Sequence, residues 1–143
     1  MICRVDYIKR KRILLPIDGT ERSLHSIELI KSIYAKNQID IIVMNVKELV
    51  FMNGMIIAEE LKNTEDSANN ILNEAAELLK GYSVKTYFTY GYASDEILRV
   101  AKEEYIDVIV MTKSTKKGLT RMLGSVTTNV MKKANCIVMI VPE

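Results

Sequence analysis

Short runs of consecutive apolar residues alternate along this chain with longer segments in which apolar residues recur every three or four positions. A short apolar run predicts a strand buried on both faces, whereas the longer spacing predicts a helix with one buried face. The pattern predicts strands at residues 13–17, 40–46, 83–90, 106–111 and 136–141, and helices at 23–35, 58–79, from 94 to at least 101, and 125–133.

Residues near the predicted helix ends support these boundaries. Asn37 follows the first helix, and Gly81 is expected at the C′ position of the second. Ser94 is predicted to cap the third helix, ahead of the acidic pair at 95–96. Within residues 47–57, the apolar residues at 51–52 and 55–57 are separated by an Asn-Gly pair, so the segment predicts a loop or an irregular start to the second helix.

Strictly alternating strands and helices predict the α/β class, with a parallel sheet covered by helices on both faces. Right-handed crossovers limit such a sheet to a few doubly wound strand orders. A ligand of such a fold binds beyond the carboxyl ends of the strands, where the winding direction reverses. The loops after the first, second and fourth strands, near residues 18–19, 45–47 and 111–125, are therefore the candidate site.

Composition narrows the class of protein. The 143 residues predict one domain, with residues 1–9 as an N-terminal extension. The chain is 48% hydrophobic and 27% charged, which is typical of a soluble globular protein. A net charge of +2 does not predict nucleic-acid binding. No apolar run approaches the ~20 residues that span a membrane, and the basic start lacks an apolar leader, so a cytoplasmic location is the default expectation.

Cysteine and histidine contribute little predicted chemistry. Cys3 and Cys136 lie at opposite ends of the sequence and do not indicate a disulfide scaffold. His25 has no cysteine near it in sequence, so no zinc site is predicted. We expect Cys136 to be a buried small apolar side chain and His25 to be a surface or interface residue.

Several short segments at the predicted strand ends and helix starts occur in a characteristic order. They are PIDGT at 16–20, MNV at 44–46, GYASDEIL at 91–98, DVIVM at 107–111, GLTRMLGSVT at 118–127 and NCIVMIV at 135–141. Together they resemble the motifs of universal stress proteins over roughly residues 10–142. The resemblance implies an open five-stranded parallel sheet of order 3-2-1-4-5, adenine nucleotide alpha hydrolase-like. It also implies a homodimer that pairs through the last strand.

Many members of that family bind ATP, and the resemblance implies a nucleotide site here, with Mg²⁺ accompanying ATP. Asp18 would accept hydrogen bonds from the ribose, and Val46 would offer its backbone to adenine. A turn-forming role for Asp18 and a packing role for Val46 are the alternatives. The residues implied to bind the nucleotide are Pro16, Ile17, Asp18, Val46, Met111, Thr112, Ser114, Thr115, Gly124, Ser125, Val126 and Thr127.

The last four of these residues open a predicted helix. Free N–H groups and the positive end of the helix dipole form an anion site at such a position. Gly124 lets a phosphate approach the backbone, and the hydroxyls of Ser125 and Thr127 can donate to phosphate oxygens. The alternative is that Ser125 is an ordinary N-cap.

The loop before this helix departs from the family pattern. ATP-binding members carry Gly-x2-Gly-x9-Gly-Ser/Thr after the fourth strand, but Thr112 and either Ser114 or Thr115 replace the first two glycines. A side chain held at positive φ costs ~1 kcal/mol or more. Four cations of the loop offer a second way to hold phosphate, unless they form only a solvated basic surface. These cations are Lys113, Lys116, Lys117 and Arg121.

Two functions follow as hypotheses. The first is a dimeric binding module that holds ATP or another adenine nucleotide and regulates partners in the stress response. The second is a family member without nucleotide that acts as a dimeric interaction protein. An enzyme is not favoured, because no Ser-His-Asp arrangement, H-E-x-x-H or G-x-x-x-x-G-K-[ST] motif is present, and at most very slow ATP hydrolysis is expected. The apolar run 136–141 is the expected edge strand of the dimer.

Overall fold

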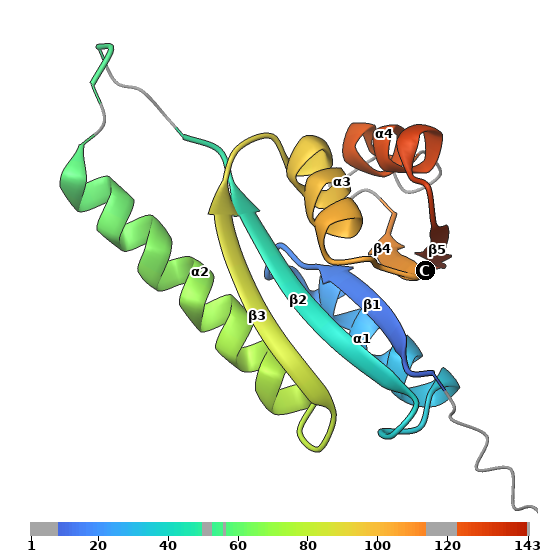
Figure 1. Cartoon of the computed structure of the whole chain (residues 1–143). Coiled ribbons are helices and arrows are strands. Elements are labelled where there is room, and N and C mark those ends of the chain that lie inside the picture. The colour runs from blue at the N-terminus through green and yellow to red at the C-terminus, as the bar shows by residue number, and fades with distance from the viewer. Residues whose placement is uncertain (1–8, 50–52, 56, 114–122, 143) are drawn as a thin grey trace, which may run out of the picture.

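A computed structural model describes the protein at residues 9–49, 53–55, 57–113 and 123–142. Over these residues the chain forms one sheet with helices on its two faces (Figure 1). The strands are β1 (Lys11–Pro16), β2 (Ile39–Lys47), β3 (Ser83–Tyr90), β4 (Val108–Thr112) and β5 (Ile137–Val141). The helices are α1 (Glu21–Ile33), α2 (Ala58–Leu78), α3 (Ala93–Glu103) and α4 (Ser125–Lys133).

The sheet has the order β3-β2-β1-β4-β5, and every neighbouring pair is parallel. This confirms the predicted α/β class and strand order. The chain winds from β1 outward to β3 and then returns past β1 to β4 and β5. The direction of winding therefore reverses between β1 and β4, and the carboxyl ends of these strands define the place for a ligand.

Two apolar clusters, one on each face of the sheet, form the core. Alternate strand residues divide between them, because successive side chains of a strand point to opposite faces. Ile13 and Leu15 pack with α1 and α2, whereas Leu14 packs with α3 and α4. All three side chains are fully buried. The unbroken apolar runs of the sequence thus reflect burial on both faces. Among the described residues, no helix is long and apolar enough to cross a membrane.

Several predicted helix ends shift by one or two residues. Thr20 caps α1, because its hydroxyl accepts a hydrogen bond from Ser23 N at 3.3 Å, so the helix begins at Glu21. The prediction that Ser94 caps α3 was wrong: Tyr92 is the N-cap, and Ser94 lies within the first turn. Gly81 has φ +93 and lies two residues beyond the C-cap of α2, one position later than predicted.

The segment between β2 and α2 contains the predicted turn. Asn53 and Gly54 have φ values of +52 and +76, which is the left-handed backbone that asparagine and glycine tolerate best. The second helix then begins at Ala58, as predicted.

Cys136 lies just before β5 and is only half-buried, so the prediction of a buried cysteine was wrong. The residue lies at the edge of the core cluster formed with α3 and α4 rather than within it. Partial burial is the main cause that raises the pKa of its thiol, and the nearby charge of Asp107 raises this pKa further. A raised pKa keeps the thiol protonated at neutral pH and lowers its reactivity.

Candidate functional site

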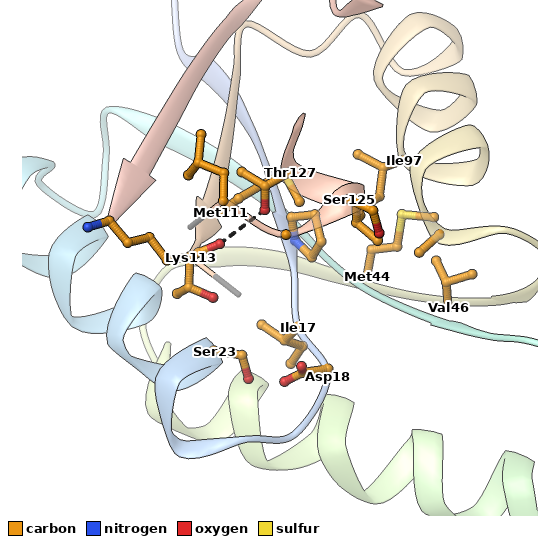
Figure 2. Close-up of a pocket in the computed structure, with 16 residues that line it drawn as sticks. Ile17, Asp18, Ser23, Met44, Val46, Ile97, Met111, Lys113, Ser125 and Thr127 are labelled. Carbon is orange, nitrogen blue, oxygen red and sulfur yellow. Dashed lines mark hydrogen bonds between the residues drawn. The ribbon is translucent and has the colours of Figure 1, made fainter. Parts of the chain in front are cut away.

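The carboxyl ends of β1, β2 and β4 surround a cleft of about 450 Å³, closed on its other sides by the starts of α3 and α4 (Figure 2). Its position matches the reversal of winding between β1 and β4. The lining residues come from six segments that are distant in sequence. They are Pro16, Ile17, Asp18, Ser23, Met44, Val46, Ala93, Ile97, Met111, Thr112, Lys113, Leu123, Gly124, Ser125, Val126 and Thr127.

Ten of the twelve residues predicted from the sequence line this cleft. The other two, Ser114 and Thr115, lie outside the described residues, as do Lys116, Lys117 and Arg121. The structure brings the loop after β1 and the start of α4 to one cavity, although more than a hundred residues separate them in the chain.

Five lining residues were not predicted from the sequence: Ser23, Met44, Ala93, Ile97 and Leu123. Two of them had a usable signal. Met44 lies two residues before Val46 on β2 and therefore faces the same side of the sheet. Ile97 lies one helical turn after Ala93, so both project from one face of α3.

Asp18 forms the turn that connects β1 to α1. Its Oδ1 accepts hydrogen bonds from Thr20 N at 3.0 Å and from Thr20 Oγ1 at 2.6 Å. The hydroxyl of Thr20 in turn accepts from Ser23 N, so the carboxylate, the cap and the first turn of α1 are linked. The turn-forming interpretation of Asp18 is therefore confirmed. The same residue is exposed and borders the cleft, so the turn also presents a carboxylate to a ligand.

Asn45 holds this turn from the neighbouring strand. It is 1% exposed, and its side-chain nitrogen donates to Ile17 O at 2.8 Å. Its Oδ1 is buried without a hydrogen-bond partner among the described residues. The bond from its side-chain nitrogen ties β2 to the residue before Asp18.

The start of α4 has no side-chain cap. Gly124 is the N-cap, and the structure gives no side-chain hydrogen bond to the first amides of the helix. The alternative in which Ser125 caps the helix was wrong, because Ser125 is already the first helical residue and its side chain is exposed at the cleft. Amides at such an end lack intrahelical partners, and they favour an anion.

Thr127 and Thr112 join α4 to the end of β4. Thr127 is 4% exposed, and its hydroxyl donates to Thr112 O at 3.3 Å. A hydroxyl has one proton, so in this arrangement Thr127 cannot also donate to a ligand. Thr112, which replaces the first glycine of the ATP-binding pattern, has no positive φ. The strain expected for a side chain at that glycine position is therefore absent at Thr112.

The cleft has an apolar side and a charged side. Met44, Val46 and Ile97 gather near α3, whereas Lys113 and Asp18 lie toward α1 (Figure 2). The described residues contain no cluster of three or more metal-ligating His, Cys, Asp or Glu side chains. Chemically, the arrangement suits a ligand with a flat apolar part, a part that donates hydrogen bonds to a carboxylate, and an anionic part at a helix start.

The fold and this placement of loops define an adenine nucleotide alpha hydrolase-like domain. The chain belongs to the universal stress protein family, because residues 9–142 match the model of that family. It is 32% identical to Universal stress protein MJ0577 of Methanocaldococcus jannaschii, over 92% of this chain and 94% of the relative. The solved structure of MJ0577 superposes with a TM-score of 0.76 and covers 93% of this chain and 96% of that one.

More distant solved structures share the fold. A universal stress protein in complex with cAMP has a TM-score of 0.72 at 20% identity, covering 93% of this chain and 97% of that chain. A universal stress protein family protein from Arabidopsis thaliana, with AMP bound, has a TM-score of 0.65 at 16% identity. That comparison covers 93% of this chain and 92% of the other.

Proposed function

We propose that this universal stress protein binds an adenine nucleotide in the cleft between β1, β2 and β4. The observation that carries the proposal is the meeting of three complementary features in one cavity. These are the exposed carboxylate of Asp18, the apolar side near Val46, and the uncapped start of α4 at Gly124. Separately, each feature has an ordinary structural explanation, whereas together they match the three parts of a nucleotide.

The base is proposed to lie against the apolar side. Met44 and Ile97 are buried, and Val46 is half-buried at the end of β2. Near a strand end, backbone N–H and C=O groups can pair with the polar edge of adenine whatever the side chain. The ribose then lies near Asp18, where its hydroxyls can donate to the carboxylate.

The phosphate is proposed to lie over the first turn of α4. Gly124 has no side chain to obstruct the approach, and the exposed hydroxyl of Ser125 adds a donor. These groups fit a nucleotide phosphate, and with ATP a Mg²⁺ ion would be held through the phosphates. A bound Mg²⁺ would neutralise part of the negative charge of the phosphates.

Relatives support the proposed nucleotide class, as the cleft does. Related solved structures hold cAMP and AMP, which share the adenosine part and a single phosphate. ATP extends that ligand by two phosphates. Because Thr112 has no positive φ, its side chain is not a source of backbone strain against such a ligand.

Calorimetry with AMP and ATP, on wild-type protein and on Gly124→Asp, tests the site. The new carboxylate repels the phosphate at the start of α4, and we expect affinity to fall at least roughly tenfold. Lys133→Gln is the matched control, because it removes one unit of charge from the other end of the same helix. Wild-type binding that Gly124→Asp leaves unchanged contradicts the site assignment.

We infer that the domain acts by binding and partner regulation as a cytoplasmic homodimer in the stress response. Its proposed dimer contact is the edge strand β5, where Ile137 is 61% exposed. The alternative, a dimeric interaction protein without nucleotide, has the loss of the loop glycine at Thr112 in its favour. Absence of any thermal shift with millimolar AMP or ATP would support that alternative.

A further inference from the structure

A second, smaller cavity of about 130 Å³ lies beside the cleft, on the α1 side of the end of β4. Three separate segments of the chain build it: the first half of α1, the end of β4, and the residues that close β5. Its lining is Arg22, His25, Thr112, Lys113, Val141 and Pro142. Thr112 and Lys113 line both cavities, so the end of β4 is the wall between them.

The side chains of this cavity are basic. Arg22, Lys113 and the protonatable His25 converge on it, and none of its described lining residues is acidic. Neither His25 nor Lys113 forms an ion pair with another described residue. A guanidinium has five N–H donors, so Arg22 can contact an anion in addition to partners within the protein.

The direction of Lys113 supports this placement. Figure 2 shows its ammonium group extending away from Asp18 and Ile17, toward the ribbon of α1. The end of the side chain therefore belongs to the second cavity, although its base borders the first. Side chains with N–H donors that are brought together around a small hollow favour a bound oxyanion, whose oxygens accept several of these hydrogen bonds. The basic side chains come from two segments that are distant in sequence, α1 and the end of β4, and they meet at one hollow rather than on a flat surface.

We propose that the second cavity is a phosphoryl-group site formed by Arg22, His25 and Lys113. The ligand chemistry is a phosphate dianion, which a bidentate guanidinium and an ammonium recognise well. Two sources can supply it. One is free inorganic phosphate or pyrophosphate, and the other is the terminal phosphate of a nucleotide seated in the cleft. The second source rests on the proposed nucleotide function, whereas the first does not.

Titration with inorganic phosphate and pyrophosphate, at constant ionic strength and without nucleotide, tests the site directly. Isothermal calorimetry gives the affinity, and amide chemical shifts in NMR report which residues respond. We expect Arg22→Gln and His25→Gln each to weaken binding by roughly threefold to fivefold, the range for partly exposed charge pairs. Lys31→Gln is the control, because it removes a charge from the same helix at a site that pairs with Glu28.

Nucleotide titrations separate the two sources. If the terminal phosphate of a nucleotide enters the second cavity, Arg22→Gln weakens ATP binding and leaves AMP binding unchanged. If the ligand is free phosphate, phosphate binds equally well with AMP at saturation. Lys113→Gln lowers the affinity for phosphate in either case. Failure of wild-type protein to bind AMP contradicts the proposed function only, because phosphate alone still tests the second cavity.

The proposal is overturned if Arg22→Gln and His25→Gln bind phosphate, pyrophosphate and ATP as tightly as Lys31→Gln does. The NMR shifts provide a fold control, because a variant that merely unfolds changes amide signals throughout the protein rather than around α1 and β4.

Discussion

At the scale of single residues, Gly19 shows how strongly the turn after β1 is constrained. Its φ of +83 lies in the left-handed region, where a side chain is strained. A Cβ at this position would also lie 2.7 Å from the end of the Ile71 side chain on α2. The turn that presents Asp18 therefore depends on glycine for its backbone angle and for its packing against α2.

Gly19→Ala is expected to lower the free energy of unfolding by about 1–3 kcal/mol, from the strained φ and the displaced Ile71. Gly54→Ala is the matched control, since Gly54 also has a positive φ, +76, but nothing lies within 4 Å of its Cβ position. Urea denaturation of both variants measures the difference. Equal losses at the two sites would show that contact with Ile71 contributes nothing.

Several single-residue roles could be predicted from the sequence and others could not. Asp18 followed by glycine indicated a turn, because aspartate in that setting bonds its own backbone, and the contacts to Thr20 confirm it. The role of Asn45 was not visible, because its partner Ile17 O lies 28 residues away in the chain. Long-range partners of a buried polar side chain depend on strand register, which only the folded sheet defines.

At the scale of elements, α4 carries two hydroxyls near its start that are arranged differently. Ser125 is exposed at the cleft, whereas Thr127 is buried and donates to Thr112 O. Both hydroxyls were predicted from the sequence to donate to phosphate. In the structure, the Ser125 hydroxyl can still donate to a phosphate, whereas the Thr127 hydroxyl donates to the end of β4.

Ser125→Ala is expected to weaken AMP binding by about fivefold, which corresponds to the loss of one net hydrogen bond of about 1 kcal/mol. Thr127→Val is expected to leave AMP affinity within about twofold while lowering stability by about 1 kcal/mol. Calorimetry and thermal unfolding separate the two effects. A large loss of AMP affinity in Thr127→Val, with unchanged stability, would show that the Thr127 hydroxyl donates to the phosphate.

The starts of the helices were the least predictable part of the elements. A serine or threonine near the first apolar position suggested a cap, which predicted Ser94 and, as an alternative, Ser125. In the structure the caps are Tyr92 and Gly124, neither of which has a side-chain capping bond. The neighbouring chain decides these ends: Gly91, with φ +145, turns the chain into α3 earlier than the serine would require.

At the scale of the whole molecule, the order of the strands leaves β5 at one edge of the sheet. Edge strands carry unpaired backbone groups and invite pairing with a second chain. Ile137 is 61% exposed in the single chain, and Val138, Met139 and Ile140 are only half-buried. An apolar edge of this kind is the physical basis of the proposed homodimer.

Ile137→Lys is expected to shift the protein toward monomer, raising the dimer dissociation constant at least roughly tenfold, because burying the ammonium at an apolar contact is costly. Met131→Lys on α4 is the control, since Met131 is likewise exposed, at 47%. Sedimentation velocity over a range of protein concentrations measures both. Wild-type protein that stays monomeric at every concentration contradicts the dimer proposal.

The sequence alone determined the number and order of elements and the α/β class, because apolar runs and helical spacing are local properties of the chain. The strand order and the family followed from resemblance, carried by short motifs at strand ends. Only the tertiary structure decided which side chains share a cavity. Met44 and Ile97 meet in the cleft, and Arg22, His25 and Lys113 meet in the basic cavity, because the crossovers bring distant segments to the same end of the sheet. Spatial convergence of this kind leaves no local pattern in the sequence.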